Sequence, residues 1–557
     1  MVLSRWRVLV FAAAAGLILH FAVPPFHNPD EPQHFSIVVR KAWGDEKKDE
    51  IERGIIEMMD RAGWWRMVGM GQPEVLPRNL ADIRFISRRM EGDIKDLHRG
   101  LLLYHRTAAM VVGPLAGKNL ERLYVLNRAF SYALFMAALL VLYGALQAVV
   151  AGRRREDEPD ASAAVARGEP LNISEGAPLL FVLFLPQLLM IALSTGSDAW
   201  CIFLGAVFFR SAFAVIRGEA GGAAVVGLFG ATVAGVLSDH SVLVFAPLAV
   251  VASLFAFKWN NPVRSVLIVL SFALGILVVA FVLVQVFPLE VERNFIYLKA
   301  RVTGSLNTFG TGMDSLFFSR LAESFFLRFG WMGFGAPRTV LWGWKISGLV
   351  ASFGIVFLFI RTMVRRMRGR GPMLKVLAFA ALAAVVQALL TRLATTSPEV
   401  MYAQGRYLFP MLLPIALLFV TGFREFFDSV ERGAAGISRL ARSVFGRRAD
   451  KINFSESDAK GSCLSGGVAE KEARGVRDGQ DGFFGLAGRG GGAALSDEKT
   501  WEAPGDALVP IGPRPPRLGE WAVTAFLIAE LLVLGYAVWA LIIPAFHLTR
   551  STPIPGI

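Results

Sequence analysis

Long apolar runs alternate with polar connections along most of this chain. A helix needs about 20 largely apolar residues to cross a bilayer, and eleven of the runs approach or exceed that length. We therefore predict an all-α fold, a polytopic transmembrane helix bundle of about eleven spans. The spans are expected at about 8–23, 124–150, 177–193, 199–216, 223–237, 242–257, 266–287, 340–360, 376–390, 408–422 and 521–546.

The connections between the runs differ in character. Residues 25–120 have mixed charge and helical patches, and we expect them to form an extracytoplasmic first-loop domain. Within them the apolar stretch 101–115 is short and interrupted by His105 and Arg106, which favours an interfacial helix over a span. Residues 450–518 are rich in Gly, Ser and charge. Such a segment buries too little apolar surface to offset the entropy of ordering, so a disordered loop is predicted.

Basic residues gather at one set of span ends. Arg5 and Arg7 precede the first run, and further clusters at 153–155, 361–370 and 432–448 follow the second, eighth and tenth runs. Lys and Arg beside short loops mark the cytoplasmic side, and one alternation of the spans places all these clusters inside. The N-terminus is then cytoplasmic and the C-terminus extracytoplasmic. No signal-peptide cleavage pattern follows the first run, which we interpret as an uncleaved span.

This pattern divides the chain into three parts. The first is a transmembrane core, 1–425, which includes the loop 25–120. The second is a cytoplasmic segment, 426–518, basic at first and then disordered, and the third is the last span with a short outside tail, 519–557. We find no internal repeat, which disfavours a transporter built from duplicated halves.

Composition narrows the class further. The 557 residues are 54% hydrophobic, with a mean hydropathy of +0.49, which excludes an ordinary soluble protein of this size. The two cysteines, Cys201 and Cys463, are far apart and indicate neither a disulfide framework nor a metal site. The net charge of +13 follows from the cytoplasmic basic clusters, so the predicted partner is the lipid bilayer and not nucleic acid.

The first candidate for chemistry lies directly after the first span. Asp30 and Glu31 are adjacent carboxylates, and His34 falls on the same face if a helix begins there. A carboxylate in this place can act as a general base toward an acceptor hydroxyl, or it can hold a divalent cation. The alternative is ordinary helix capping, because Asn and Asp before Pro and Glu are frequent at helix starts. The spacing leaves both interpretations open.

The second candidate is Gln404-Gly405-Arg406-Tyr407 at the outer end of the tenth span. A forked guanidinium in this place can bind a phosphate or a pyrophosphate. The alternative is an interfacial Arg-Tyr anchor whose polar ends reach the lipid headgroups.

Three further elements are weaker candidates. The polar turns Ser194–Asp198 and Ser238–His240 fall at outer span ends, where they can line one cavity with Asp30 or serve only as turns and caps. Arg128 lies inside the second apolar run, where a charge is costly unless it is paired, so it is a site candidate by default. The aromatic Phe329-Gly330-Trp331 can dip into the membrane.

Together these elements resemble a bacterial family of membrane proteins, domain of unknown function 2142, over roughly residues 1–425. The chain departs from the family pattern at Ser194-Thr195-Gly196-Ser197-Asp198, where a Ser-x-Ser-Tyr-Asp element is usual, and at Ser238–Ser241, where a Lys-Pro-x-Tyr element is frequent. The matching motifs, in order, are Asp30-Glu31-Pro32-x-His34-Phe35, Arg128-Ala129-Phe130-Ser131, Leu185-Pro186 followed by Ser194 to Asp198, Phe329-Gly330-Trp331, and Gln404 to Pro410.

The family in turn is similar to the integral-membrane glycosyltransferases of GT-C type, which use polyprenyl-phosphate sugars. These have an acidic motif in the first extracytoplasmic loop. The resemblance implies that Asp30, with Glu31, is the catalytic carboxylate of an inverting transferase. We further predict substrate binding by His34, Arg128, Asp198, Gln404, Arg406 and Tyr407.

The expected reaction moves a sugar from a polyprenyl-phosphate donor to a hydroxyl of a cell-envelope glycan or glycolipid. It would take place on the outer face of the bacterial cytoplasmic membrane. The chemistry needs no cofactor, although an Asp-Glu pair near a His is compatible with a divalent cation. Two alternatives remain, a transporter or flippase for an envelope lipid or glycan, and a non-catalytic membrane partner in envelope polysaccharide assembly.

Overall fold

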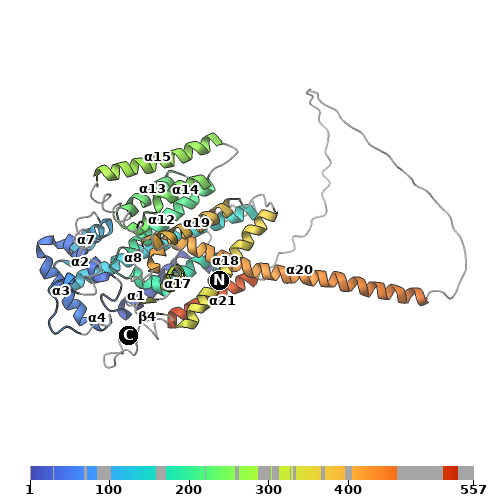
Figure 1. The fold of residues 1–557 in the computed structure, drawn as a ribbon, viewed down its shortest axis with the longest axis horizontal. Helices are drawn as coiled ribbons and strands as arrows, with labels where there is room; N and C mark the ends of the chain where they lie inside the picture. The colour runs from blue at the N-terminus through green and yellow to red at the C-terminus, as the bar shows by residue number, and fades with distance from the viewer. Residues whose placement is uncertain are drawn as a thin grey trace, which may run out of the picture. The chain divides into compact units, whose positions relative to one another are not determined.

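The computed structural model describes a chain that is almost entirely helical (Figure 1). Its only strands within the described part are two short antiparallel ribbons, β1 (Val2–Leu3) with β2 (Leu171–Asn172) and β3 (Arg328–Phe329) with β4 (Phe334–Gly335). The predicted all-α class is therefore confirmed. The described residues are 2–28, 30–67, 72–83, 102–157, 171–219, 221–256, 262–286, 303, 313–326, 328–329, 334–335, 337–365, 371–394, 404–460 and 518–536.

Each predicted span corresponds to a helix or to a pair of helices. Among the described residues, eight helices are long and apolar enough to cross a bilayer, or nine if α10 and α11, bent by 60° where Pro186 begins the second, form one broken span. Two others, α13 and α14, have only 15 and 11 residues, so the predicted count of eleven stays a prediction. The helices are α1 (Arg5–Ala22), α8 (Leu120–Asp157), α10 (Ile173–Leu183), α11 (Pro186–Ala192), α12 (Asp198–Arg217), α13 (Gly222–Val236), α14 (Phe245–Phe255), α15 (Pro262–Val286), α18 (Arg338–Arg365), α19 (Gly371–Ala394), α20 (Leu412–Lys460) and α21 (Leu518–Tyr536).

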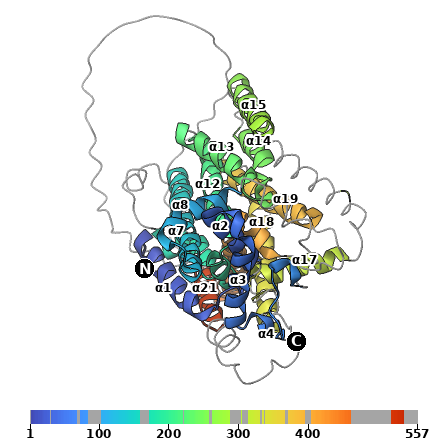
Figure 2. The same ribbon diagram turned by 90° about the vertical axis from the view of Figure 1, so that its left-hand side faces the viewer.

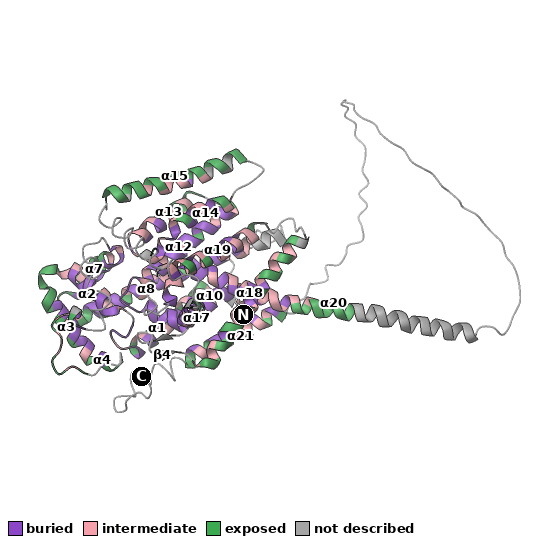
Figure 3. Ribbon diagram, in the orientation of Figure 1, coloured by how far each residue is buried: buried purple, intermediate pink, exposed green. Residues whose placement is uncertain are grey.

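Exposure on the helices agrees with a multi-pass membrane protein. α12 is mostly buried, whereas α15 exposes apolar side chains along its length (Figure 3). On α15, Leu267, Leu274 and Leu277 are each more than half exposed. An apolar surface of this extent favours contact with lipid. The kind of membrane and the side that each terminus faces stay predictions.

The described residues between α1 and α8 form a group of short helices. They are α2 (Glu31–Trp43), η1 (Asp45–Lys47), α3 (Lys48–Arg61), α4 (Trp64–Met67), η2 (Leu80–Asp82) and α7 (Leu103–Ala116). The amphipathic α3 turns Ile51, Ile55 and Met59 inward, and these pack with Phe35 and Trp64 in a core of their own. Figure 2 shows α2 and α7 beside α8. The predicted extracytoplasmic position of this group, and the interfacial position of α7, stay predictions.

The chain divides into two compact units, residues 1–429 with 518–557, and residues 430–517. Within the second unit α20 continues to Lys460, so the first residues of the segment predicted to be disordered are helical. Residues 461–517 lie outside the described residues, as do 537–546 at the end of the last predicted span.

Candidate functional site

The structure brings three of the predicted residues together on one guanidinium. Arg406 forms an ion pair with Asp30, 376 positions earlier in the chain, through Nη2. Its other terminal nitrogen, Nη1, lies 3.5 Å from Asp198 Oδ2. The exposed fractions of the three side chains are 8% for Arg406, 25% for Asp30 and 17% for Asp198. One buried arginine therefore bridges two partly accessible carboxylates.

Asp30 stands at the N-cap position of α2 but does not cap the helix. Its backbone is left-handed, with φ 59° and ψ 10°, and its side chain makes no capping hydrogen bond. A non-glycine residue held in this conformation costs about 1–3 kcal/mol, and such residues concentrate at functional sites. The capping alternative for Asp30 is therefore wrong, because its carboxylate pairs with Arg406 instead.

Arg406 is held by the backbone around it. It lies on η5 (Gly405–Met411), where the Gly405 N–H donates to Ser324 Oγ at 2.6 Å. A Cβ on Gly405 would lie 2.2 Å from the Phe325 nitrogen, so only glycine allows this approach to α17 (Met313–Phe326). From α19, Gln387 Nε2 donates to the Tyr407 carbonyl at 2.7 Å. Arg406 is thus packed inside the protein, which speaks against a headgroup anchor.

Tyr407 and Gln404, close to Arg406 in the sequence, also lie at the site. The guanidinium of Arg406 lies over the Tyr407 ring, 5.4 Å from its centroid. Gln404 is 6% exposed, and its Oε1 is a buried acceptor that makes no hydrogen bond with the described residues. Buried polar atoms are nearly always hydrogen-bonded, so an unsatisfied acceptor beside Arg406 is a position where a substrate hydroxyl can donate.

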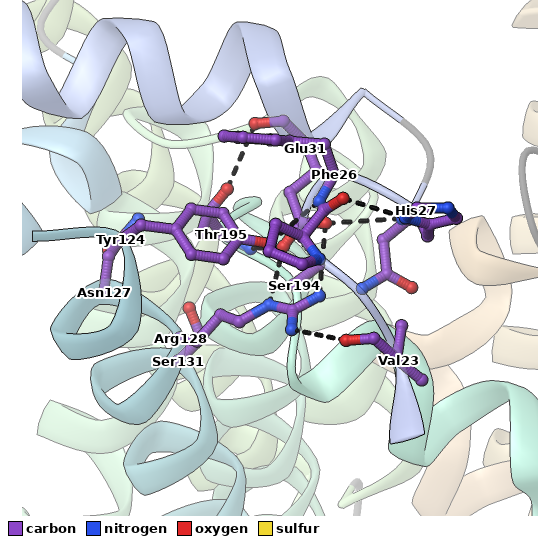
Figure 4. A network of polar contacts seen from close by, with 12 residues as sticks. Val23, Phe26, His27, Glu31, Tyr124, Asn127, Arg128, Ser131, Ser194 and Thr195 are labelled. Carbon is purple, nitrogen blue, oxygen red and sulfur yellow. Dashed lines mark hydrogen bonds and ion pairs between the residues drawn. The ribbon is translucent and has the colours of Figure 1, made fainter. Parts of the chain in front are cut away.

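A second ion pair, between Glu31 and Arg128, is completely buried, and its Glu31 directly follows Asp30 in the sequence. Glu31 is 0% exposed and Arg128 is 2% exposed, and Arg128 Nε donates to Glu31 Oε1 at 3.1 Å (Figure 4). The terminal nitrogens of Arg128 donate to the carbonyls of Val23 at 3.0 Å and Pro24 at 3.2 Å. All three guanidinium nitrogens therefore have partners within the protein.

The Glu31 carboxylate is satisfied in the same way. It accepts from the backbone N–H of Thr195 and of Asn28, each at 3.3 Å, while Thr195 Oγ1 donates to the Glu31 carbonyl at 3.1 Å. A buried pair is stable only when its remaining hydrogen bonds are made, as they are here. In this arrangement Glu31 and Arg128 join the start of α2 to α8 and to the 194–197 turn.

His34 has a buried partner that the sequence did not identify. Its Nδ1 lies 2.8 Å from Nε2 of His105 on α7, and the two rings stack with centroids 5.1 Å apart. A Cβ placed on Gly196 would lie 3.3 Å from His34 Cδ2 and 3.5 Å from Asp198 Oδ2. Because residue 196 is glycine, no side chain is placed there between His34 and Asp198.

Burial lowers the pKa of His34 below its usual value of 6.5. The charges of Asp30, Asp239 and Glu31 oppose that shift, and the charge of Arg406 adds to it. His34 is thus a neutral side chain among charged ones. Its contact with His105 holds a single hydrogen, so one ring donates and the other accepts.

The two polar turns predicted at outer span ends do meet. Ser197 Oγ donates to Asp239 Oδ2 at 3.0 Å, and the Ser241 N–H donates to Asp239 Oδ1 at 2.8 Å. Trp200 Nε1 donates to Ser238 Oγ at 2.8 Å, which joins α12 to the second turn. Asp239 thus contributes another carboxylate close to the site. The third weak candidate, Phe329-Gly330-Trp331, lies outside the described residues at Gly330 and Trp331.

Among the described residues no three His, Cys, Asp or Glu side chains are grouped as a metal site. The use of a divalent cation stays as open as the sequence left it. In comparisons with known proteins, no family model, no curated protein and no solved structure matches this chain.

Proposed function

We propose that this chain is a membrane glycosyltransferase of the kind that its sequence resembles. It would move a sugar from a polyprenyl phosphate to a hydroxyl of a cell-envelope glycan or glycolipid, on the outer face of the bacterial cytoplasmic membrane. The observation behind this proposal is the contact of Asp30 with Arg406. Within a bundle of apolar helices, the carboxylate that follows the first span contacts a buried arginine, and an arginine side chain is suited to bind a phosphate.

In the proposed reaction Asp30 acts as the general base. It takes the proton of the acceptor hydroxyl while that oxygen attacks the anomeric carbon of the sugar. The bond from this carbon to the phosphate oxygen breaks with its electron pair leaving on the phosphate, and the configuration inverts. Arg406 offsets the charge that develops on the leaving phosphate. Because a lipid phosphate is already a fair leaving group, positioning and charge stabilisation are sufficient.

The remaining predicted residues have supporting roles. Glu31 and Arg128 position the segment that presents Asp30, and Asp198 holds the second nitrogen of Arg406. The unsatisfied Gln404 Oε1, with Tyr407 beside it, offers hydrogen bonding to a sugar hydroxyl. His34 lies on α2, which begins directly after Asp30, and orients the acceptor side of the site.

The test is mass analysis of envelope glycans in a deletion strain. The strain is complemented with wild type, with Asp30→Asn, or with Asp49→Asn, a matched control on the exposed surface of α3. Membrane levels of the three proteins are equalised first. We expect one sugar to be missing in the deletion strain, and to be restored by wild type and Asp49→Asn but not by Asp30→Asn. Full restoration by Asp30→Asn would contradict the assignment of the base.

One observation favours a second candidate, a transporter or flippase. The 60° break between α10 and α11 resembles the interrupted helices that form transporter binding sites, and α11 leads into the Ser194 turn. Under this alternative the glycan is built but stays on the wrong side of the membrane. Detection of the intact glycan precursor inside the deletion strain would favour transport over transfer.

A further inference from the structure

The guanidinium of Arg406 is already occupied in this structure. Nη2 contacts Asp30 and Nη1 contacts Asp198. With 8% of its side chain exposed, Arg406 lies beneath both carboxylates, and Asp30 is the more exposed of the two. A phosphate that approaches from solvent therefore meets the Asp30 carboxylate before it reaches the guanidinium.

The contact between Asp30 and Arg406 also conflicts with the role of each residue. A carboxylate in contact with a guanidinium is a weaker base than a free one, because the opposite charge favours its ionised form. Arginine stays protonated in proteins, so the pair cannot relax by proton transfer. As long as the pair is closed, the base is weak and the phosphate ligand is covered.

We propose that the phosphate of the donor binds by displacing Asp30 from Arg406, so that donor binding itself frees the base. This inference rests on the proposed function for the identity of the donor, a polyprenyl phosphate. In the exchange Nη2 passes from the Asp30 carboxylate to a phosphate oxygen, and Asp198 keeps Nη1 and holds the guanidinium in place. No covalent bond changes.

The exchange has a consequence for the order of binding. Asp30 becomes a competent base only when a phosphate leaving group already sits on Arg406. The donor then binds before the acceptor is activated, and an acceptor hydroxyl or a water molecule that enters an empty site is not deprotonated. His34 contacts His105, and the Glu31 carboxylate is satisfied by Arg128 and by the backbone N–H of Thr195, so neither replaces Asp30.

Equilibrium binding of a polyprenyl monophosphate without a sugar tests the proposal on the full-length protein in nanodiscs. If Asp30 competes with the phosphate, Asp30→Asn removes the competitor and binds the lipid about tenfold more tightly than wild type, in the usual range of coupling between two ligands of one group. In an Arg406→Gln background the same change of Asp30 should give no gain. Arg406→Lys serves as a second background in which the positive charge is kept and folding is better preserved.

Two controls separate competition from a general effect of charge. Asp239→Asn removes a negative charge from the same region, at a carboxylate that accepts hydrogen bonds from Ser197 and Ser241, and should tighten binding less than Asp30→Asn. Asp198→Asn shows which carboxylate is displaced. Equal affinity of wild type and Asp30→Asn, a gain that persists without Arg406, or a larger gain in Asp198→Asn would each overturn the proposal.

Binding is measured without turnover, so this test is independent of the transferase proposal. If Asp30 competes with the phosphate but the protein transfers no sugar, the transferase proposal is wrong and the exchange stands. If the protein transfers sugar but Asp30→Asn leaves its phosphate affinity unchanged, the exchange is wrong and the transferase proposal stands.

Discussion

Glu31 and Arg128 form an ion pair across 97 positions of sequence, with 0% and 2% of their side chains exposed. Removing one member of a buried pair leaves the other charge without compensation, which typically costs about 3–5 kcal/mol. We therefore expect Arg128→Leu to lower the free energy of unfolding by about that amount, and to reduce the yield of monodisperse protein. Thermal and denaturant unfolding in detergent measure the effect.

A second Arg-Glu pair between the same two regions is the control for this prediction. Arg61 of α3 contacts Glu121 of α8 at 2.7 Å, but both side chains are about two thirds exposed. Exposed pairs contribute little, so Arg61→Leu should change stability by less than about 1 kcal/mol. Equal effects of the two substitutions would show that burial of the Glu31–Arg128 pair is not what matters.

Gly405 is the point at which a single methyl group should disturb the site. Its Cβ would lie 2.2 Å from the Phe325 nitrogen, and a backbone atom cannot turn aside as a flexible side chain can. Gly405→Ala must therefore shift η5 and with it Arg406. Displacement of a catalytic group by about 1 Å can cost about 100-fold in rate, so for the proposed transferase we expect a loss of sugar transfer of that order.

Gly343 of α18 provides the comparison, because no atom lies within 4 Å of its Cβ position. Gly343→Ala should leave transfer unchanged and stabilise the helix slightly. If Gly405→Ala transferred sugar as well as Gly343→Ala, the close packing of η5 would not be what positions Arg406.

The helices could be predicted from the sequence because apolar length is a local property. The same local view missed the break at Pro186, although proline ends a helix that would otherwise continue across it. It also treated α13 and α14 as full spans, where the structure has 15 and 11 helical residues. Length and hydropathy thus predicted which segments are helical better than where each helix ends.

The contacts within the site could not be predicted from local sequence patterns, because they join residues far apart in the chain. Asp30 before Pro and Glu has the sequence of a cap, and only Arg406, 376 positions away, decides that it is not one. An arginine within an apolar run predicts that a partner exists, but nothing in the run around Arg128 names Glu31 as that partner. In the sequence, His105 is visible only as an interruption of the apolar stretch 101–115, and this gives no indication that its partner is His34.

Cysteine labelling tests the predicted topology. Asp49 is exposed on α3 and should be outside, whereas the native Cys463 belongs to the predicted cytoplasmic loop. In intact cells an impermeant maleimide should label Asp49→Cys. It should label Cys463 only after the membrane is permeabilised, and the buried Cys201 should stay unlabelled in both cases. Labelling of Cys463 in intact cells would invert the topology and move Asp30 to the cytoplasmic side.

Because His34 is buried with a lowered pKa, we expect the protein to lose stability on acidification. Burial lowers its pKa in the folded state below the value of 6.5 that applies to the unfolded chain. Below about pH 6.5 the unfolded chain therefore binds a proton that the folded chain does not, so stability is highest above this pH and falls as the pH drops toward the folded pKa. Protonating both rings would also place two N–H groups against each other at the 2.8 Å contact with His105.

We expect His34→Gln to remove part of this pH dependence. Unfolding temperatures between pH 7.5 and 5 should fall more for wild type than for the variant, after size-exclusion chromatography at pH 7.5 has shown that both are folded. Gln at this position can still donate to or accept from His105 but cannot take up a proton in this range. Parallel pH profiles of the two proteins would mean that the acid sensitivity arises elsewhere and that His34 is protonated as easily in the fold as in the unfolded chain.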